Sequence, residues 1–483
     1  MKKGSSILIV VGVVVAAAVV GISGGIVPKG EKCGEEAPIW PDYKGVTMPK
    51  NIAAPRFDVE GAEKAAALVE SPTGVIKVRK GREVTIPNKK WKKLAVQGGP
   101  LKISVLGRFE GKWKEFAPFE IYISEDEIDP MLAYRLVDPG YELWYRMGIY
   151  QRNLTNYSQK CILNNSLTDN GCMNCHSFCN RDPHKMLFHL RAKMGGTYLV
   201  QNGAVEKLNT KTDSTVSALV YPSWHPSGKY VAFSVNDIRQ FFHSTDPNRI
   251  EVADLCSDVV VYDVDRHEVF SASQLKSVDS FETFPTFSPD GSRLYFCTSP
   301  AVEIPQDYKN AVYSLCSIAF DPQSRSFGAE VDTLYSGGSA SFPRVSPDGR
   351  YLLFTRSDYG NFSIWHKEAD LYGVDLSTGD VSCWDAFNGK DTDSYHSWSS
   401  NSRWVVFSSR RDDGLYTRPY IGHVASDGTL SKPFMIPARR ARQHRQLMKS
   451  YNIPEFIAAP VSVGKRKLVN TAKSDGVNIG YAD

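Results

Sequence analysis

The residues best suited to chemistry lie together in the stretch GCMNCHSFCN, from Gly171 to Asn180. Within it, Cys172 and Cys175 are three positions apart, and His176 follows directly. Two thiols at this spacing can bond to the two vinyl groups of one haem, and the adjacent imidazole can then ligate the iron. The pattern therefore predicts one covalent haem c per chain, with His176 as the proximal iron ligand.

Three other interpretations of this stretch remain open. A zinc site would need Cys161 or Cys179 as a further ligand, because no second Cys/His pair stands a dozen or more residues away. A thioredoxin-like redox pair would follow a strand and begin a helix in an α/β unit, and the neighbouring sequence lacks that pattern. A purely structural disulfide is the third alternative. The spacing favours haem over these.

The ligand opposite His176 is less well defined, because a c-type haem takes either Met or His there. In the strand-like run MLFHLR, alternation places His189 and Arg191 on one face and Met186 on the other. We rank His189 first as the distal ligand, with Arg191 as a partner for a haem propionate. Met186 and Met194 are the next candidates.

The remaining cysteines suggest two disulfides, provided that the chain is exported. Cys161 and Cys179 flank the haem motif, and a bridge between them would close that loop and contribute about 3 kcal/mol. Cys297 and Cys316 lie on successive strand-like runs and could pair across a hairpin. Seven of the nine cysteines remain after haem attachment, so at least one thiol is unpaired within the chain.

The N-terminus predicts an export signal that is not removed. MKKGSS is followed by 21 uncharged residues from Ile7 to Val27, which as a helix would be about 30 Å long and could span a bilayer. The apolar core of a cleaved signal peptide is shorter, at about 7–15 residues. Lys2 and Lys3 should stay in the cytoplasm. We therefore predict a signal anchor over 1–27 in a bacterial cytoplasmic (inner) membrane, with the bulk of the chain periplasmic.

A repeat follows the cysteine cluster, in units that start at Tyr221, Phe284, Phe342 and Tyr395 and are 63, 58 and 53 residues apart. The first three units encode a strand, a Pro-containing Gly turn and a second strand, and the last has lost this turn sequence. Two further strand-like runs separate the units, and four strands per repeat are typical of a propeller blade. These hairpins resemble the TolB-like propeller repeat of exported bacterial proteins.

The fold class that we predict is mainly β. It combines a five- or six-bladed TolB-like β-propeller over 186–437 with a small β-sandwich-like domain over 74–128, where short alternating runs occur. Residues 28–73 are rich in Pro, Gly and Lys and are expected to be a linker. The aromatic-rich segment that leads to the cysteines predicts a short helical haem-binding region over 129–185, and 438–483 is a C-terminal tail.

A wider resemblance joins these parts. YRLVDPGYELWYRMGIYQRNL, followed by CMNCHSF and HLRAKMGGT, is similar to a group of membrane-associated bacterial proteins that combine a CxxCH haem site with a TolB-like propeller. The resemblance implies a single c-type haem and an exported location. It implies no particular biochemical activity.

Function is constrained mainly by what is missing. The formal charge of +4 gives no reason to expect nucleic-acid binding. No Gly-x-Ser-x-Gly, phosphate loop or His-Glu-x-x-His is present, and His225 and His396 recur at similar positions of two hairpins, which favours a structural role. We predict a membrane-anchored periplasmic monohaem cytochrome that exchanges electrons with a protein partner on the propeller face, an electron carrier rather than an enzyme. The alternatives are a scaffold or sensor that binds a protein, peptide or glycan, with a structural or redox-sensing haem, and a peroxidase-type enzyme.

Overall fold

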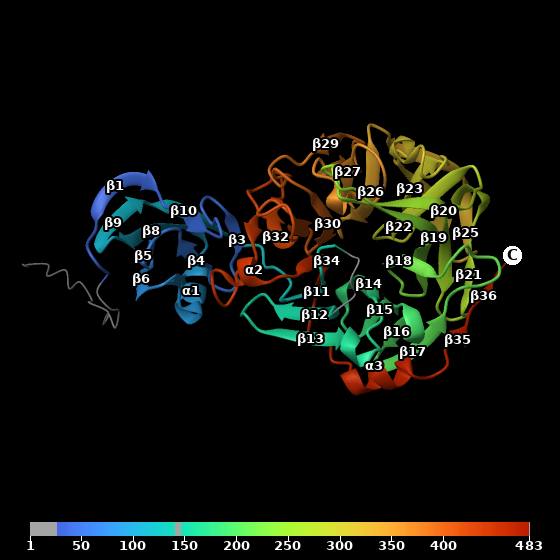
Figure 1. Ribbon diagram of the computed structural model, residues 1–483, viewed down its shortest axis with the longest axis horizontal. Helices are drawn as coiled ribbons and strands as arrows, with labels where there is room; N and C mark the ends of the chain where they lie inside the picture. The colour runs from blue at the N-terminus through green and yellow to red at the C-terminus, as the bar shows by residue number, and fades with distance from the viewer. Residues whose placement is uncertain (1–26, 141–145, 483) are drawn as a thin grey trace, which may run out of the picture.

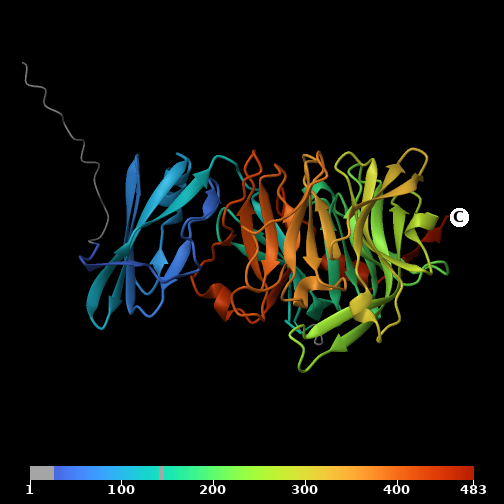
Figure 2. The ribbon, with the colours of Figure 1, turned by 90° about the horizontal axis from the view of Figure 1, so that it is seen from above.

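The computed structural model describes residues 27–140 and 146–482, which form an N-terminal β domain and a larger propeller side by side (Figures 1 and 2). The β domain ends near residue 128, and every later strand belongs to the propeller. Strands dominate both parts, and the helices are few and short.

The N-terminal domain is built on one seven-stranded sheet, against which a three-stranded layer and helix α1 (Asn88–Ala95) pack. Trp91 and Leu94 of α1 are buried in the shared core, whereas its lysines point outward. The large sheet contains β1 (Glu31–Glu36), β3 (Thr47–Pro49), β5 (Lys64–Ser71), β6 (Gly74–Gly81), β8 (Gly99–Phe109), β9 (Lys112–Ala117) and β10 (Phe119–Ser124). The small layer contains β2 (Ile39–Trp40), β4 (Arg56–Val59) and β7 (Val84–Thr85). Much of the predicted linker 28–73 is therefore part of this domain.

Among the described residues, six sheets surround the propeller axis, and their innermost strands contact one another in a closed ring. Five of these sheets are continuous in sequence or extended only at the outer edge. The first two contain β14 (Met173–Phe178), β15 (Lys185–Leu190), β16 (Gly196–Gln201) and β17 (Ala204–Asn209), and β18 (Leu219–Trp224), β19 (Tyr230–Phe242), β20 (Ile250–Asp263) and β21 (Glu268–Phe270), respectively. The third contains β22 (Ser280–Phe287), β23 (Arg293–Pro300), β24 (Ser314–Asp321) and β25 (Ser326–Tyr335). The fourth contains β26 (Ser339–Val345), β27 (Tyr351–Ser357), β28 (Asp370–Asp375) and β29 (Val381–Cys383). A fifth follows as β30 (Asp393–Trp398), β31 (Trp404–Ser409), β32 (Arg418–His423), β33 (Phe434–Met435).

Both ends of the propeller chain build the remaining sheet and so close the ring. β11 (Met131–Val137), β12 (Gly148–Asn153) and β13 (Gln159–Asn164) come before the cysteine motif, whereas the innermost strand β34 (Ser450–Ile457) comes from the predicted tail. After α2 (Gln443–Gln446) and α3 (Lys465–Ala472), β35 (Val477–Asn478) and β36 (Gly480–Tyr481) add to the outer edges of two other sheets. The propeller thus extends well beyond the predicted 186–437 in both directions.

The predicted helical segment 129–185 is wrong, because its described residues form β11 to β14 and two short 3-10 turns. All seven residues of β11 are buried, so this strand has no polar face and lacks the alternation that identifies a half-exposed strand. The described residues are mainly β, as predicted, but the predicted fold with a helical haem-binding segment is not what they form.

One local feature repeats in all six innermost strands. Each has a β-bulge, and the bulged residue has a φ between 47° and 54° although it is not glycine. Such a backbone is strained, and its recurrence shows that the fold imposes it. The six bulged residues are Cys175, Tyr221, Phe284, Phe342, Tyr395 and Ile453.

Candidate functional site

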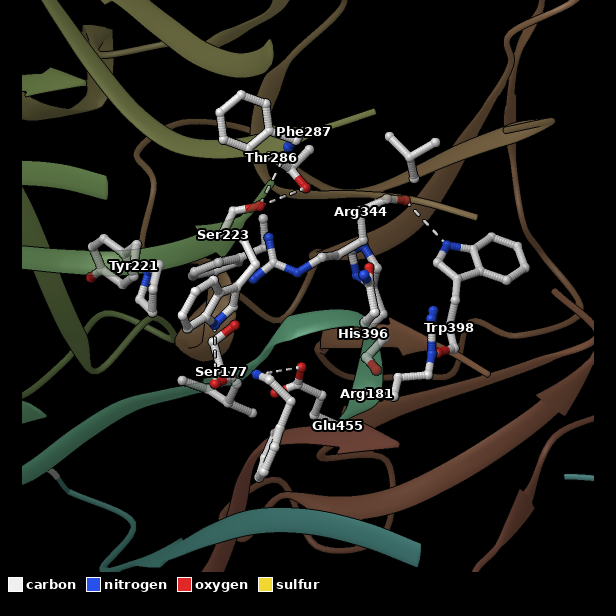
Figure 3. Close-up of a pocket in the computed structure, with 18 of the residues that line it drawn as sticks. Ser177, Arg181, Tyr221, Ser223, Thr286, Phe287, Arg344, His396, Trp398 and Glu455 are labelled. Atoms are coloured by element: carbon white, nitrogen blue, oxygen red, sulfur yellow. Dashed lines mark hydrogen bonds between the residues drawn. The ribbon is translucent and has the colours of Figure 1, made fainter. Parts of the chain in front are cut away.

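A pocket of about 300 Å³ lies on the propeller axis and is lined by residues of all six innermost strands (Figure 3). Exposed residues at its rim, such as Asn180 and Pro289, belong to turns at the end of these strands. The pocket therefore opens on the face where the first and second strands of each sheet are joined. A concave site at the centre of a rigid ring is a common place for ligand binding.

The bulged residues close the deep end of the pocket. Four of them are aromatic, and the ring centroids of Phe284 lie 4.6 Å from Tyr221 and 4.2 Å from Phe342. The Phe342 and Tyr395 centroids are 4.6 Å apart. These contacts form an aromatic collar, defined here as Tyr221, Phe284, Phe342 and Tyr395, which supplies an apolar floor.

Polar side chains form a ring above the collar, because each follows the bulged residue of its strand by two positions. Four carry hydroxyl groups and two carry charges, and all line the pocket. Two of the hydroxyl groups approach each other, with Ser223 Oγ 3.4 Å from Thr286 Oγ1. The ring consists of Ser177, Ser223, Thr286, Arg344, Ser397 and Glu455.

Three charged residues decide the electrostatics of the pocket. Arg344 Nη1 donates to the carbonyl oxygen of Pro343 at 2.9 Å, and Arg181 Nε donates to the carbonyl oxygen of Trp398 at 3.0 Å. Burial lowers the pKa of both guanidinium groups, although both remain cationic. Glu455 is the acidic residue among those that line the pocket, so cationic charge is in excess.

The carboxyl group of Glu455 is poised near neutrality. Burial raises its pKa to about 7, against the opposing effects of the Phe178 N–H, Arg344 and Arg181. The Phe178 N–H donates to Glu455 Oε1 at 3.1 Å, which fixes the side chain at the pocket wall. At pH 7 the group therefore exists in both protonation states, as a general acid or base requires.

The structure separates the residues of the haem motif. Cys172 packs into an apolar core cluster with Met131 and Met186, whereas Cys175 occupies the bulge and lines the axial pocket. The motif lies in strand β14 and its flank, so no single turn presents both thiols together with His176.

The histidine of the motif is explained by the repeat. Cys175, His176, Ser177 and Phe178 take the positions that Tyr395, His396, Ser397 and Trp398 take in another innermost strand. Burial lowers the pKa of both histidines to about 3.

In the described residues no group of three or more His, Cys, Asp or Glu side chains could hold a metal ion. These findings contradict the predicted haem c and with it the cytochrome function.

None of the residues predicted to contact the far side of the haem lines the axial pocket. His189 is buried on β15, where its Nδ1 lies 2.8 Å from Thr197 Oγ1, and Met186 is enclosed in an apolar cluster. Met194 packs at the edge of that cluster, and neither it nor Arg191 lines the axial pocket. His225 and His396, for which a structural role was predicted, lie at different places in their hairpins: His225 lies in a turn with Nε2 3.1 Å from the carbonyl oxygen of Gly291, and His396 lies in β30 with Nε2 2.8 Å from the carbonyl oxygen of Leu353.

All nine cysteines lie in the described part of the chain, and all are free thiols. Cys161 and Cys179 therefore form no bridge here. Cys297 and Cys316 occupy adjacent strands, but Cys316 lies opposite Phe296 and not opposite Cys297. Burial raises the pKa of both thiols, which makes them inert core residues.

The charged residues of the pocket were missed from the sequence, although a signal for two of them exists. Arg344 follows Phe-Pro in its repeat, and Glu455 follows Ile-Pro in the tail segment YNIPEF. That segment matches the start of the repeat unit and would have identified β34 as an innermost strand. Arg181 lies in a 3-10 turn outside the repeat and has no such signal.

Comparison with known proteins assigns no family. No family model and no curated protein matches the chain. Among solved structures it is similar to a mutant of the Synechocystis apocarotenoid oxygenase (9% identity, TM-score 0.38, 85% of this chain and 95% of that one) and to an ACO/RPE65 chimera (9%, 0.41, 89% and 97%). It is also similar to the tricorn protease (12%, 0.35, 82% and 36%). The expected TolB-like haem proteins are not among these.

The neighbours named above include an oxygenase and a protease, whereas the sequence predicted a non-catalytic electron carrier. Similarity at this level transfers neither activity to this chain. Across 27–140 and 146–482, no helix has the length and apolar character needed to cross a bilayer, the feature on which the predicted inner-membrane location depends. The stretch on which that prediction was based lies, apart from Val27, outside the described residues.

Proposed function

We propose that the axial pocket binds a small organic anion, a carboxylate carried on an apolar body. The observation that carries this proposal is the charge of the pocket, where Arg181 and Arg344 face one carboxyl group that is partly protonated at pH 7. A buried guanidinium group is stabilised by an anion and forms strong charge-assisted hydrogen bonds with a carboxylate.

The remaining lining fits the rest of such a ligand. The aromatic collar offers an apolar floor, and the hydroxyl groups of Ser177, Ser223 and Ser397 offer hydrogen bonds around the wall. A volume of about 300 Å³ is at the lower end of the range for small-molecule sites. The pocket therefore suits a compact molecule with one anionic group.

Tryptophan fluorescence tests the proposal, because Trp224 and Trp398 line the pocket. The probes are 3-phenylpropionate and its neutral amide, which share one body and differ in charge. We expect saturable binding of the acid and much weaker binding of the amide.

The matched variants are Arg344→Met, which removes a pocket charge, and Arg466→Met, which removes an exposed charge elsewhere. Loss of a charge-assisted hydrogen bond is worth about 1.5–3 kcal/mol, so Arg344→Met should weaken binding about 10- to 100-fold. Equal affinity for acid and amide, or equal affinity of the two variants for the acid, would refute the proposal.

An acid–base enzyme is the second candidate function, and Glu455 favours it. A carboxyl group with a pKa of about 7 beside two arginines is a typical arrangement for proton transfer to or from a bound anion. When assayed with a substrate that the wild type converts, Glu455→Gln should still bind this substrate but should no longer convert it. Unchanged turnover in this variant would remove the enzyme hypothesis while leaving the binding proposal intact.

A further inference from the structure

The opposite face of the propeller carries a long hairpin. β19 and β20 continue past their sheet as a two-stranded arm, defined here as residues 236–256, which projects beyond the propeller face in Figure 2. The turn between β18 and β19 lies at the mouth of the axial pocket, so the far end of β19 lies on the other face.

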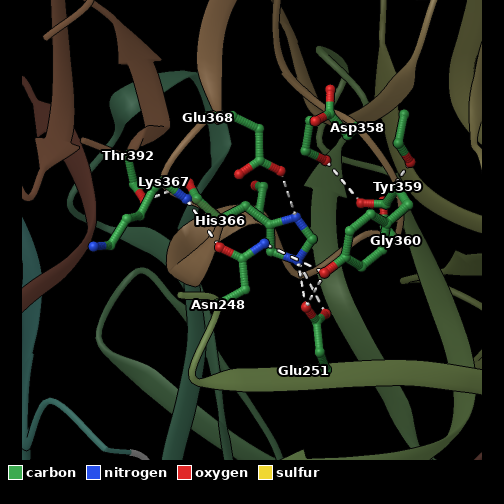
Figure 4. Close-up of polar contacts among 12 residues, drawn as sticks. Asn248, Glu251, Asp358, Tyr359, Gly360, His366, Lys367, Glu368 and Thr392 are labelled. Carbon is green, nitrogen blue, oxygen red and sulfur yellow. Dashed lines mark hydrogen bonds and ion pairs between the residues drawn. The ribbon is translucent and has the colours of Figure 1, made fainter. Parts of the chain in front are cut away.

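A buried ionic network holds the arm in place (Figure 4). Glu251 of the arm lies 2.9 Å from His366 Nε2, and His366 Nδ1 lies 3.2 Å from Glu368. Tyr359 donates its hydroxyl hydrogen to Glu251 at 3.0 Å. The two carboxylates outweigh burial and raise the pKa of His366 to about 9, so it is cationic at neutral pH. The arm is therefore fixed against the loop that follows β27.

A second cavity, of about 560 Å³, lies between the tip of this arm and loops of two other sheets. Trp365 and Lys367 come from the loop that follows β27. Asp391 comes just before β30 and Arg410 just after β31, in the neighbouring sheet. The aromatic collar and the strands beneath it separate this cavity from the axial pocket, and no residue lines both.

Cationic groups dominate the second cavity. Arg410 is 2% exposed, and its guanidinium carbon lies 3.2 Å from the Trp365 ring centroid. Arg249 and Lys367 are exposed at the rim. Of the two acidic residues in the lining, Asp246 is paired with Lys309 at 3.3 Å, which leaves Asp391 to face three cations.

The cavity also offers a buried imidazole and two exposed apolar side chains. His243 Nε2 is buried, lines the cavity and has no hydrogen-bond partner among the described residues. An imidazole N–H at this position can donate to an oxyanion. Phe242 and Leu415 are 51% and 42% exposed at the rim, so an apolar group is available to a ligand that reaches outward.

We propose that this cavity is a second binding site, for a phosphate monoester carried on an apolar body. The excess of two positive charges matches a phosphate monoester, which is close to dianionic at pH 8. At pH 8, where Glu455 is mostly ionised, the axial pocket has an excess of about one positive charge and matches a monoanion. The two sites thus differ in the charge of the ligand that they accept, and this proposal does not depend on the function of the axial pocket.

Calorimetric titration of the full chain at pH 8 tests the proposal with three probes. Phenyl phosphate supplies both charge and apolar body, phenyl sulfate supplies one charge on the same body, and inorganic phosphate supplies the charge alone. We expect phenyl phosphate to bind most tightly of the three. The affinity should fall with added salt, because two of the cations are at the rim.

The matched double variants are Arg249→Glu/Lys367→Glu at the rim and Arg239→Glu/Lys473→Glu at exposed positions outside the lining. The first should weaken binding of phenyl phosphate at least about tenfold, and the second should leave it near wild type. Arg344→Met should not affect it, which separates this site from the axial pocket. No saturable binding of phenyl phosphate, equal binding of phenyl sulfate, or equal effects of the two double variants would overturn the proposal.

Discussion

Replacing Glu455 with glutamine should change how the stability of the propeller depends on pH. The variant keeps an oxygen that can accept the Phe178 N–H and removes the titration. In the folded chain the pKa of Glu455 is raised from 4.5 to about 7, mainly by burial. The folded state therefore holds this proton in a pH range where the unfolded chain has already lost it.

The sign follows from this difference. As pH rises from about 4.5 to about 7, the wild type loses stability through this group, because deprotonation favours the unfolded chain. The gap between the two pKa values corresponds to about 3 kcal/mol. Glu455→Gln should therefore gain about 3 kcal/mol relative to wild type between pH 4 and pH 8.

Urea unfolding followed by tryptophan fluorescence at pH 4, 5, 6, 7 and 8 measures this difference. Other titrating groups affect both proteins equally, so the difference between variant and wild type isolates Glu455. A difference that stays constant over this range would refute the inferred burial of an ionisable carboxyl group at the pocket wall.

Two further predictions concern the arm and the haem motif. Because the pKa of His366 is raised from 6.5 to about 9, its ion pairs should stabilise the arm fully below about pH 6.5 and lose that effect as pH rises through 9. Hydrogen exchange of residues 236–256, corrected for intrinsic rates, should therefore accelerate between pH 8 and 10 in the wild type. A His366→Gln variant with the same pH dependence would contradict this. His176 takes the position that Pro222 and Pro454 take in other innermost strands, so His176→Pro should lower the free energy of unfolding by at most about 2 kcal/mol. His189 lies in the centre of a sheet, where a proline removes a ladder hydrogen bond, so His189→Pro should lower it by about 3 kcal/mol or more. Equal losses for the two variants in urea unfolding would show that the innermost strands are not equivalent.

Much of the propeller could be predicted from the sequence, because its turns carry a local signal. The units that begin at Phe284 and Phe342 share a Pro-Asp-Gly turn, and that of Tyr221 has Pro-Ser-Gly, so their hairpins are visible in the chain. The sheet of β11, β12, β13 and β34 could not be identified in this way. Its strands come from distant parts of the chain, and β11 is buried on both faces.

The candidate site shows a different limit. A Cys-x-x-Cys-His spacing indicates haem only if the local backbone presents both thiols together with the imidazole, and the sequence does not state that geometry. In the fold, Cys175 and His176 belong to a bulge that recurs in six strands. Arg344 and Glu455 gain their importance from the closure of the ring, which brings residues more than 100 positions apart to one axis.

The position of a bound ligand tests the central claim most directly. A crystal of the full chain soaked with 3-(4-bromophenyl)propionate would locate the bromine by its anomalous signal. We predict bromine in the axial pocket against the aromatic collar or the tryptophan side chains, with the carboxylate within hydrogen-bond distance of Arg344. Bromine bound only elsewhere, or a carboxylate directed away from Arg344 and Arg181, would contradict the proposed anion site.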